Sequence, residues 1–152
     1  MKSISKSYGV PGIRLGILCS ADMELIAQMK KEVSIWNINS FAEYFMQIFN
    51  KYEKDYIRAC EKFIAEREDF EQKLKQISFL RVMPSQANYF LCEILPPKNA
   101  RQLVLTMLKQ YNILLRDCSD KQGFDGKQYM RIAVRSHEDN TRLIQAFKEL
   151  EA

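Results

Sequence analysis

The sequence has little histidine and cysteine, and this scarcity excludes several kinds of site. Its 152 residues include one histidine and four cysteines, and no two cysteines have C-x-x-C spacing, so we expect no bound metal. Cys60 and Cys92 lie within apolar patterns typical of buried thiols, while Cys19 and Cys118 stand far from them. Unpaired, dispersed cysteines favour a reducing, cytoplasmic setting.

Long apolar runs and charge of one sign are also missing. The apolar runs are far shorter than the roughly 20 residues that span a bilayer, and the N-terminus is polar, without a signal core. Lysine and arginine total 23 against 19 acidic residues, and the charges are interspersed. Proteins that bind nucleic acid cluster basic residues on one face. We therefore expect neither a membrane nor a nucleic-acid partner.

The apolar periodicity of the first half is mainly helical. Ser40 is predicted to begin a helix with Glu43 as its capping partner, and the helical pattern then runs from 41 to about 77, with a break near Asn50 left open. The elements before it are predicted to be a strand at 13–19, a helix at 21–31 and a connector at 33–38.

In the second half, the spacing of apolar residues changes repeatedly between the helical and the strand period. Strands are predicted at 80–83, 87–94, 112–116 and 129–134, and helices from the caps Asn99 and Ser136 to about 110 and 150. This order of two strands, helix, two strands, helix favours an α/β chain of the α+β kind. We expect a mostly antiparallel sheet of about four strands with helices on one face. Residues from about 80 onward are expected to fold independently.

Residues 3–16 carry the most specific pattern. They match S-x-S-K-x-x-G-x-x-G-x-R-x-G at seven positions in fourteen residues. This string resembles the pyridoxal-phosphate (PLP) attachment segment of class I/II aminotransferases. In that family the lysine forms a Schiff base with the cofactor, and the serine and arginine hold its phosphate. The resemblance gives these roles to Lys6, Ser3 and Arg14.

The residue types suit that chemistry. A lysine amine whose pKa is lowered by a desolvated pocket can attack an aldehyde and then move a substrate proton. A guanidinium and a hydroxyl are good phosphate donors, and glycines allow a tight loop to cross the site. The alternative is a solvated lysine in a flexible N-terminal tail, which we would favour for an isolated lysine but not for this string. Residues 1–12 are expected to be mobile or held by a neighbouring chain.

Two arginines further along resemble substrate-binding residues of the same family. Residues 129–135 resemble the strand whose arginine binds the substrate α-carboxylate, which implies that role for Arg131. Residues 113–117 resemble a segment of histidinol-phosphate aminotransferases and threonine-phosphate decarboxylases, in which an arginine helps to bind the substrate phosphate; Arg116 matches it. The alternative for each is an arginine on the wet face of a strand.

Weaker resemblances single out Asn88 and Trp36. Residues 84–90 resemble the family's S-x-A-N-F segment, so Asn88 is expected to orient neighbouring backbone or the substrate arginine, with a plain structural role given equal weight. Residues 36–40 resemble W-N-x-N-S/A, in which Trp36 contacts substrate or fills a hinge, and we favour hinge packing. His137 is expected to be exposed and inert.

The resemblance covers essentially the whole chain and implies a C-terminal part of a longer enzyme, because the family lysine usually lies past mid-chain. Residues 1–38 would come from the large domain, and 39–152 would form the small domain. We expect a homodimeric PLP-dependent transaminase acting on a phosphorylated amino acid or amine with a 2-oxo acid, and inactive as this isolated chain. The alternatives are a phospho-amino-acid decarboxylase and a non-catalytic small-domain module.

Overall fold

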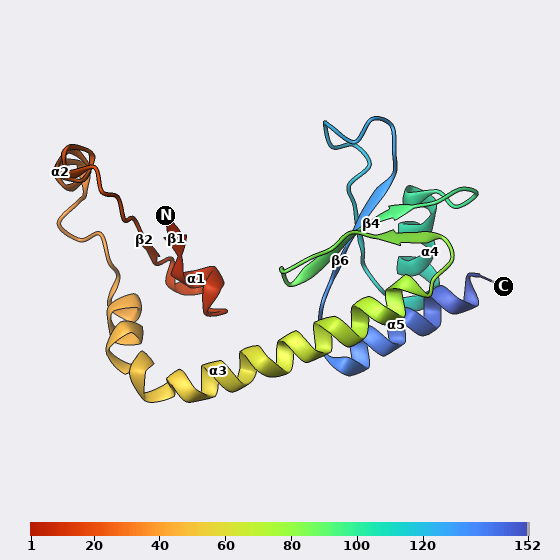
Figure 1. Cartoon of the computed structure of the whole chain (residues 1–152), viewed down its shortest axis with the longest axis horizontal. Helices are drawn as coiled ribbons and strands as arrows, with labels where there is room; N and C mark the ends of the chain where they lie inside the picture. Colours follow the sequence, from red (N-terminus) through yellow and green to blue (C-terminus); the bar gives the residue numbers. More distant parts are fainter. Residues whose placement is uncertain (152) are drawn as a thin grey trace. The chain divides into compact units, whose positions relative to one another are not determined.

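The computed structural model describes residues 1–151, which form two compact units. The first comprises Met1–Cys60, and the second begins at Glu61. Helix α3 (Ser40–Lys75) contributes residues to both (Figure 1). The predicted boundary at residue 38 concerns which parts of the chain correspond to a large and a small domain, and it stays a prediction.

The first unit is built from short elements. They are β1 (Lys2–Ser3), α1 (Ile4–Ser7), the 3-10 helix η1 (Pro11–Ile13), β2 (Gly16–Ile17), α2 (Met23–Glu32) and the start of α3. Strands β1 and β2 pair antiparallel, with Ser3 opposite Gly16. The strand predicted at 13–19 is confirmed only at β2, because η1 and the left-handed Arg14 occupy its beginning. Helix α2 confirms the predicted helix, and the Asp22 side chain caps it.

The first unit has a small core. Only Ile4, Leu15 and Ala42 form its buried cluster, with Tyr8, Ile13 and Phe45 packed against them. Many large apolar side chains here are exposed instead, among them Met23, Ile35, Trp36, Phe41 and Tyr44. Hydrogen bonds and packing connect residues 3–10 to Leu15 and to the start of α3. Whether residues 1–12 are mobile or held by a neighbouring chain stays a prediction.

Helix α3 starts from a different cap than predicted. The Asn39 side chain, not Ser40, accepts a hydrogen bond from the backbone N–H of Ala42 at 3.0 Å, and Ser40 is the first helical residue. The helix passes Asn50 without a break, although Figure 1 shows it bending in the stretch coloured golden yellow. Neither α3 nor any other described helix combines the length and apolar character needed to cross a bilayer.

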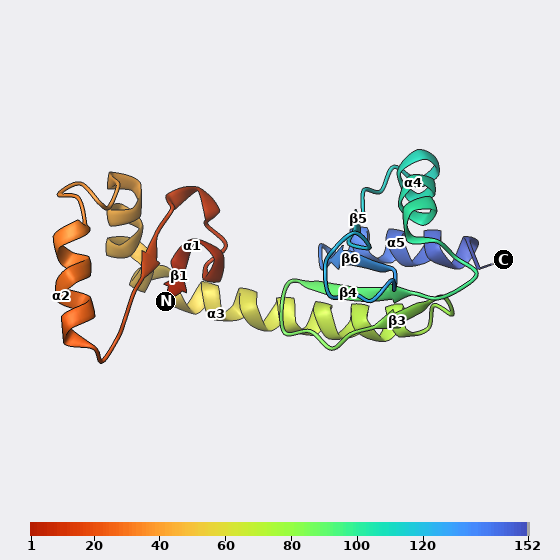
Figure 2. The same ribbon diagram turned by 90° about the horizontal axis from the view of Figure 1, so that it is seen from above.

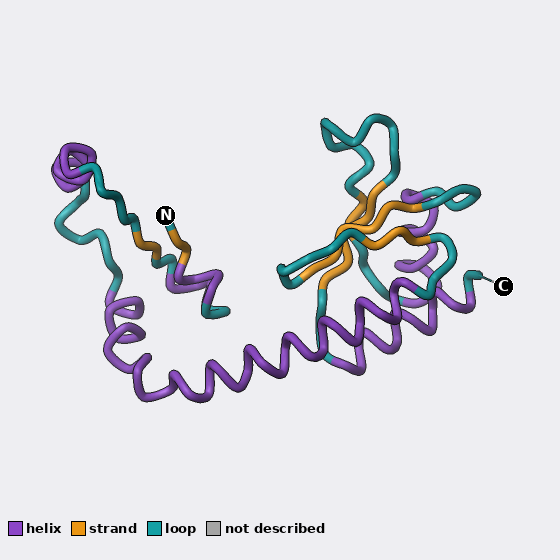
Figure 3. Tube along the Cα trace, in the orientation of Figure 1, coloured by secondary structure: helices purple, strands orange, loops and turns teal. Residues whose placement is uncertain are grey.

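The second unit contains a four-stranded antiparallel sheet in the order β3-β4-β6-β5. The elements are β3 (Leu80–Val82), β4 (Tyr89–Ile94), α4 (Ala100–Tyr111), β5 (Arg116–Asp117), β6 (Tyr129–Ala133) and α5 (His137–Glu149). Figure 2 separates α4 from α5, and Figure 3 shows the strands gathered together. The predicted fold class is confirmed.

Alternation along the central strands divides the sheet into two faces. Phe90 and Cys92 of β4 lie opposite Ile132 and Met130 of β6, and all four are fully buried. The helices cover this inner face and complete one core, with Phe70, Leu74, Leu103, Met107, Leu143 and Phe147 among the buried side chains that they supply. Because side chains alternate along a strand, Arg131 points to the opposite, outer face.

The helix caps in the second unit match the prediction, but one strand differs from it. Asn99 accepts a bond from Gln102, and Ser136 accepts one from Asp139, as expected. The strand predicted at 112–116 is wrong in extent: β5 begins only at Arg116. Asn112 instead takes a left-handed conformation, with φ of 57°, and ends helix α4. Asn tolerates this conformation because its short side chain bonds locally.

Candidate functional site

Lys6 lies in the one-turn helix α1, between residues that are firmly held. The neighbouring Ser5 is buried, and its hydroxyl accepts a bond from Leu15 N at 2.7 Å and donates to Leu15 O at 3.2 Å. The Ser5 N–H also donates to Leu15 O at 3.2 Å. The Lys6 side chain itself is exposed. The backbone around the lysine is therefore fixed, while its amine stays accessible.

Ser3 and Arg14 meet at a shallow hollow of about 210 Å³. Ser3 occupies the N-cap position of α1, yet its hydroxyl makes no capping bond. Arg14 is held in the left-handed region, and its guanidinium donates only a long bond, 3.4 Å, to Pro11 O. Gly16 lines the same hollow. The hollow thus offers a hydroxyl that caps no helix and a guanidinium, the donor types that bind phosphate.

Arg116 and Arg131 form a second candidate group, in the other unit. They are directly opposite each other on β5 and β6, and both are exposed. The guanidinium carbon of Arg131 lies 5.2 Å from the centre of the Tyr89 ring. Among the ion pairs of residues 1–151, neither arginine has an acidic partner. Like charges directly opposite in a sheet destabilise it, so this pair is suited to binding anions.

Asn88 and Trp36 are the candidates that rest on the weaker resemblances. The Asn88 carbonyl accepts a bond from Val134 N at 2.9 Å, which aligns the start of β4 with the end of β6. Its side chain makes no hydrogen bond within the described part of the chain, so the structure shows a backbone role. Trp36 is 91% exposed. Hinge packing and substrate contact both stay predictions for this side chain.

His137 is exposed as predicted but is not inert. Its Nδ1 lies 3.1 Å from Glu66 Oε2 and 3.9 Å from Asp69 Oδ2, linking α5 to α3. The three side chains could supply metal ligands, since their ligand atoms lie within 4.8 Å of one another. However, buried Asn140 already donates to Glu66 at 2.8 Å, and Lys73 pairs with Asp69 at 2.6 Å. The contacts describe a polar cluster that fastens two helices.

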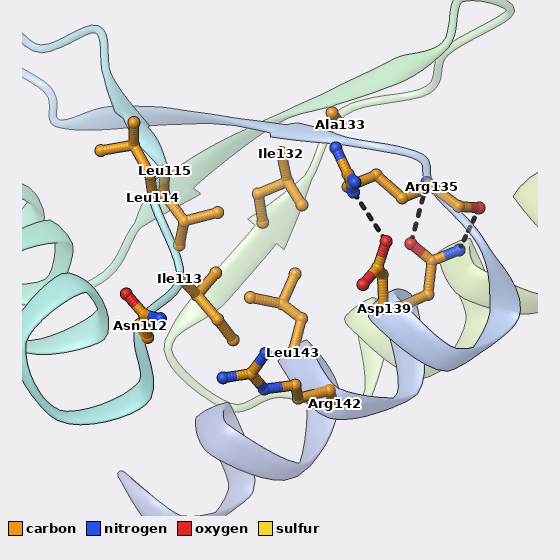
Figure 4. Close-up of a pocket in the computed structure, with 11 residues that line it drawn as sticks. Asn112, Ile113, Leu114, Leu115, Ile132, Ala133, Arg135, Asp139, Arg142 and Leu143 are labelled. Atoms are coloured by element: carbon orange, nitrogen blue, oxygen red, sulfur yellow. Dashed lines mark hydrogen bonds and ion pairs between the residues drawn. The ribbon is translucent and has the colours of Figure 1, made fainter.

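A cavity of about 280 Å³ opens between α5 and the segment before β5 (Figure 4). Arg135 and Arg142 stand at it, but both are already engaged: Arg135 Nε donates to Asp139 at 2.8 Å, and Arg142 donates to Tyr111 O at 2.5 Å. The hydrogen bond from Arg135 lowers the pKa of the Asp139 carboxyl. The apolar lining of the cavity includes Ile113, Leu115, Ile132 and Leu143. These two guanidiniums contrast with those of Arg116 and Arg131, which have no acidic partner among residues 1–151.

Three residues that hold the backbone near the candidate site residues were not predicted from the sequence. Ser5 belongs to the recognised string, but its burial depends on a contact with Leu15, 10 positions further along the chain. Buried Arg67 donates to Gln86 O at 3.0 Å and fixes the loop before β4. The Tyr56 hydroxyl donates to Ser7 O at 2.9 Å. The last two contacts join residues 19 and 49 positions apart, which no local pattern reveals.

A known protein family matches nearly the whole chain. The family model for aminotransferase class I and II matches residues 1–147. The chain belongs to this family. Members of the family are PLP-dependent, which agrees with the cofactor expected from the lysine string.

Curated relatives of this aminotransferase-family chain include enzymes named for phosphorylated substrates. An L-serine phosphate decarboxylase of Campylobacter jejuni is 34% identical over 98% of the chain and 39% of that protein. The threonine-phosphate decarboxylase of Salmonella typhimurium is 31% identical over 99% of the chain and 40% of that protein. The chain therefore spans about two fifths of the length of these relatives.

A solved structure from the same family has a similar fold. The histidinol-phosphate aminotransferase from Clostridium acetobutylicum superposes with a TM-score of 0.86 at 30% identity, covering 98% of this chain and 44% of that one. The arrangement of helices and antiparallel sheet is thus shared with a family member along nearly the whole chain.

Proposed function

We propose that this chain contributes the cofactor lysine and the substrate-binding arginines of a PLP-dependent enzyme that transaminates a phosphorylated amino acid or amine, with a 2-oxo acid as acceptor. The observation that carries the proposal is the arginine pair on adjacent strands. Arg116 and Arg131 face each other without an acidic partner in the described residues, and a substrate with two anionic groups would neutralise both. The names of the relatives support a phosphate as one of these groups.

The first unit suits the cofactor. Its hollow offers the Ser3 hydroxyl and the Arg14 guanidinium for a phosphate, and Lys6 lies just beyond Ser5, with an accessible amine. PLP, when bound, supplies an electron sink for negative charge at the substrate α-carbon. In this proposal Lys6 holds the cofactor and then acts as the base and acid that moves the α-proton.

The second unit suits the substrate. We assign Arg131 to the α-carboxylate, because a guanidinium matches a carboxylate with two charge-assisted bonds. Arg116 is assigned to the phosphate. Asn88 is a weaker candidate for aligning Arg131, and the exposed Trp36 ring is a candidate substrate contact.

Decarboxylation of a phospho-amino acid is the second candidate function. It is favoured by the names of the Campylobacter and Salmonella relatives, and it would use the same lysine and arginines without a 2-oxo acid. Product analysis separates the two reactions. Release of carbon dioxide without consumption of a 2-oxo acid would favour the decarboxylase.

The proposal is tested with two arginine variants in an active enzyme that contains this chain. Arg131→Ala should impair every amino-acid substrate, and Arg116→Ala should impair phosphorylated substrates selectively. Loss of a charge-assisted hydrogen bond costs about 1.5–3 kcal/mol, so kcat/KM should fall about ten-fold or more. Arg101→Ala, another exposed arginine of the second unit, serves as the control. Equal loss on phosphorylated and unphosphorylated substrates in the Arg116 variant would remove the case for phosphate recognition.

The non-catalytic alternative is tested on the chain itself. We expect weak PLP binding and no transamination, because few family cofactor contacts are among these residues. After addition of PLP and reduction with borohydride, mass spectrometry locates the adduct. Preferential labelling of Lys6 supports a cofactor site, whereas equal labelling of all exposed lysines favours a non-catalytic module.

A further inference from the structure

Helix α1, which carries Lys6, is fastened to helix α3 by four aromatic side chains. We call Tyr8, Phe45, Phe49 and Tyr56 the aromatic cluster. The Tyr8 ring centre lies 4.5 Å from that of Phe49 and 4.7 Å from that of Tyr56. Phe45 lies 5.7 Å from Phe49 and 6.4 Å from Tyr8. Tyr8, two residues beyond Lys6, therefore packs against side chains of α3.

Tyr56 adds a directional contact to this packing. Its hydroxyl donates to Ser7 O at 2.9 Å, and Ser7 is the last residue of α1 and the residue after Lys6. Carbonyl groups at the end of a helix have no partner within the helix. The Tyr56 bond is the one described hydrogen bond that the Ser7 carbonyl accepts.

A helix of one turn needs such contacts. Helix α1 has four residues, far fewer than a helix requires to be stable by itself. Its two sides are held from different directions: Ser5 is bonded to Leu15, and Ser7 is bonded to Tyr56. Lys6 lies between them and has an exposed side chain.

We propose that Tyr56 is a positioning residue for Lys6. By holding the Ser7 carbonyl, it sets the orientation of the α1 backbone and hence the direction in which the lysine amine leaves it. The inference rests on the proposed cofactor role of Lys6. It extends that role to a residue 50 positions away, on a helix that supplies no proposed ligand of cofactor or substrate.

The test compares Tyr56→Phe with Tyr52→Phe in the full chain. Tyr56→Phe removes the hydroxyl and keeps the ring in the aromatic cluster. Tyr52 is one turn earlier on α3 and 47% exposed, and it makes no described bond to α1, so Tyr52→Phe is the matched control. Amide hydrogen exchange is measured first, without cofactor. Exchange at Tyr8, Gly9 and Val10 should accelerate about two- to ten-fold in Tyr56→Phe, as expected for one lost hydrogen bond, and remain unchanged in the control.

The second measurement reports on the lysine. PLP is added across a range of pH and trapped with borohydride, and the ratio of Lys6 to Lys2 labelling is determined by mass spectrometry. In Tyr56→Phe this ratio should fall about two- to ten-fold across the pH profile, with the thermal midpoint kept near that of the wild type. In Tyr52→Phe it should match the wild type.

Each result has a distinct meaning. Unchanged exchange and an unchanged labelling ratio in Tyr56→Phe would overturn the inference. Faster exchange with an unchanged ratio would reduce Tyr56 to a structural contact and overturn it as well. If wild-type Lys6 is labelled no more than Lys2, the proposed cofactor role fails, and the positioning role fails with it, whatever the exchange rates show.

Discussion

At the scale of single residues, the arginines differ in whether they have a hydrogen-bonding or ion-pair partner among residues 1–151. Arg135 pairs with Asp139, and buried Arg67 donates to a backbone carbonyl. Arg116 and Arg131 instead face each other, and like charges directly opposite in a sheet reduce its stability. Residues that reduce stability are expected where function needs them. The pair therefore stands out because neither arginine has an acidic partner among residues 1–151.

The cysteines give a prediction at the same scale. Burial raises the pKa of the Cys92 thiol from 9.0 to about 12. The thiolate is the reactive form, so Cys92 should resist alkylation in the folded protein, while exposed Cys19 reacts. The unfolded thiol ionises first, so the contribution of Cys92 to stability is complete below pH 9.0 and is lost as the pH rises from 9.0 to about 12.

Mass spectrometry after brief treatment with iodoacetamide measures this difference. Half-buried Cys60 provides an intermediate case, and alkylation in denaturant shows that all four thiols can react. Equal native rates at Cys19 and Cys92 would contradict the burial described for β4.

At the scale of elements, the start of α3 gives a second prediction. Asn39→Ala removes the cap bond to Ala42 and the 2.8 Å bond from Asn39 Nδ2 to Ile13 O. Loss of a cap typically lowers the free energy of unfolding by about 0.5–2 kcal/mol. Ser40→Ala is the matched control, because the Ser40 side chain makes no cap bond, and it should have little effect.

Amide exchange at Ala42 and Glu43 is the direct measurement. The Asn39 variant should open the first turn of α3, with urea unfolding giving the free energy. A larger effect from Ser40→Ala than from Asn39→Ala would restore the cap that the sequence suggested.

Elements were predictable where their signals are local. Asn99 and Ser136 cap helices as expected because each bonds three residues ahead. The strand at 112–116 was placed too early because apolar residues there resemble a strand, while the left-handed Asn112 sets where α4 ends. In the candidate site, the sequence alone singles out the lysine string and the two arginines, and their roles stay predictions. The direct opposition of the arginines and the contacts of Ser5, Arg67 and Tyr56 depend on pairing between distant segments.

At the scale of the whole molecule, the second unit should fold by itself only if it includes the end of α3. Phe70, Leu74 and Ile77 are at most 1% exposed and belong to its core. The sequence suggested independent folding from residue 80, but that fragment lacks all three. Each such loss costs roughly 2–5 kcal/mol, against a total stability of about 5–15 kcal/mol for a domain.

We therefore expect residues 61–152 to unfold cooperatively in urea and residues 80–152 to show no cooperative transition. Circular dichroism across a urea series measures both. A cooperative transition of similar midpoint in the shorter fragment would show that α3 is dispensable.

Association is the second prediction at this scale. Exposed Trp36 and Phe41, at 91% and 80%, belong to the apolar surface of the first unit, and such surfaces promote association. We expect the chain to form a dimer in solution by light scattering. Trp36→Ser with Phe41→Ser should weaken it, whereas Leu114→Ser, at a 76% exposed site of the second unit, should not. A strict monomer at high concentration would contradict this account.

The alternation along β6 also bears on how such a protein can evolve. Met130 and Ile132 face the core, and Arg131 between them faces outward. Folding constrains the inner set of positions, and the proposed ligand contact belongs to the outer set, one residue apart. New specificities can arise by substitution on the outer face while the inner face keeps the sheet intact. A single strand can thus be inherited unchanged in structure by enzymes that diverge in chemistry.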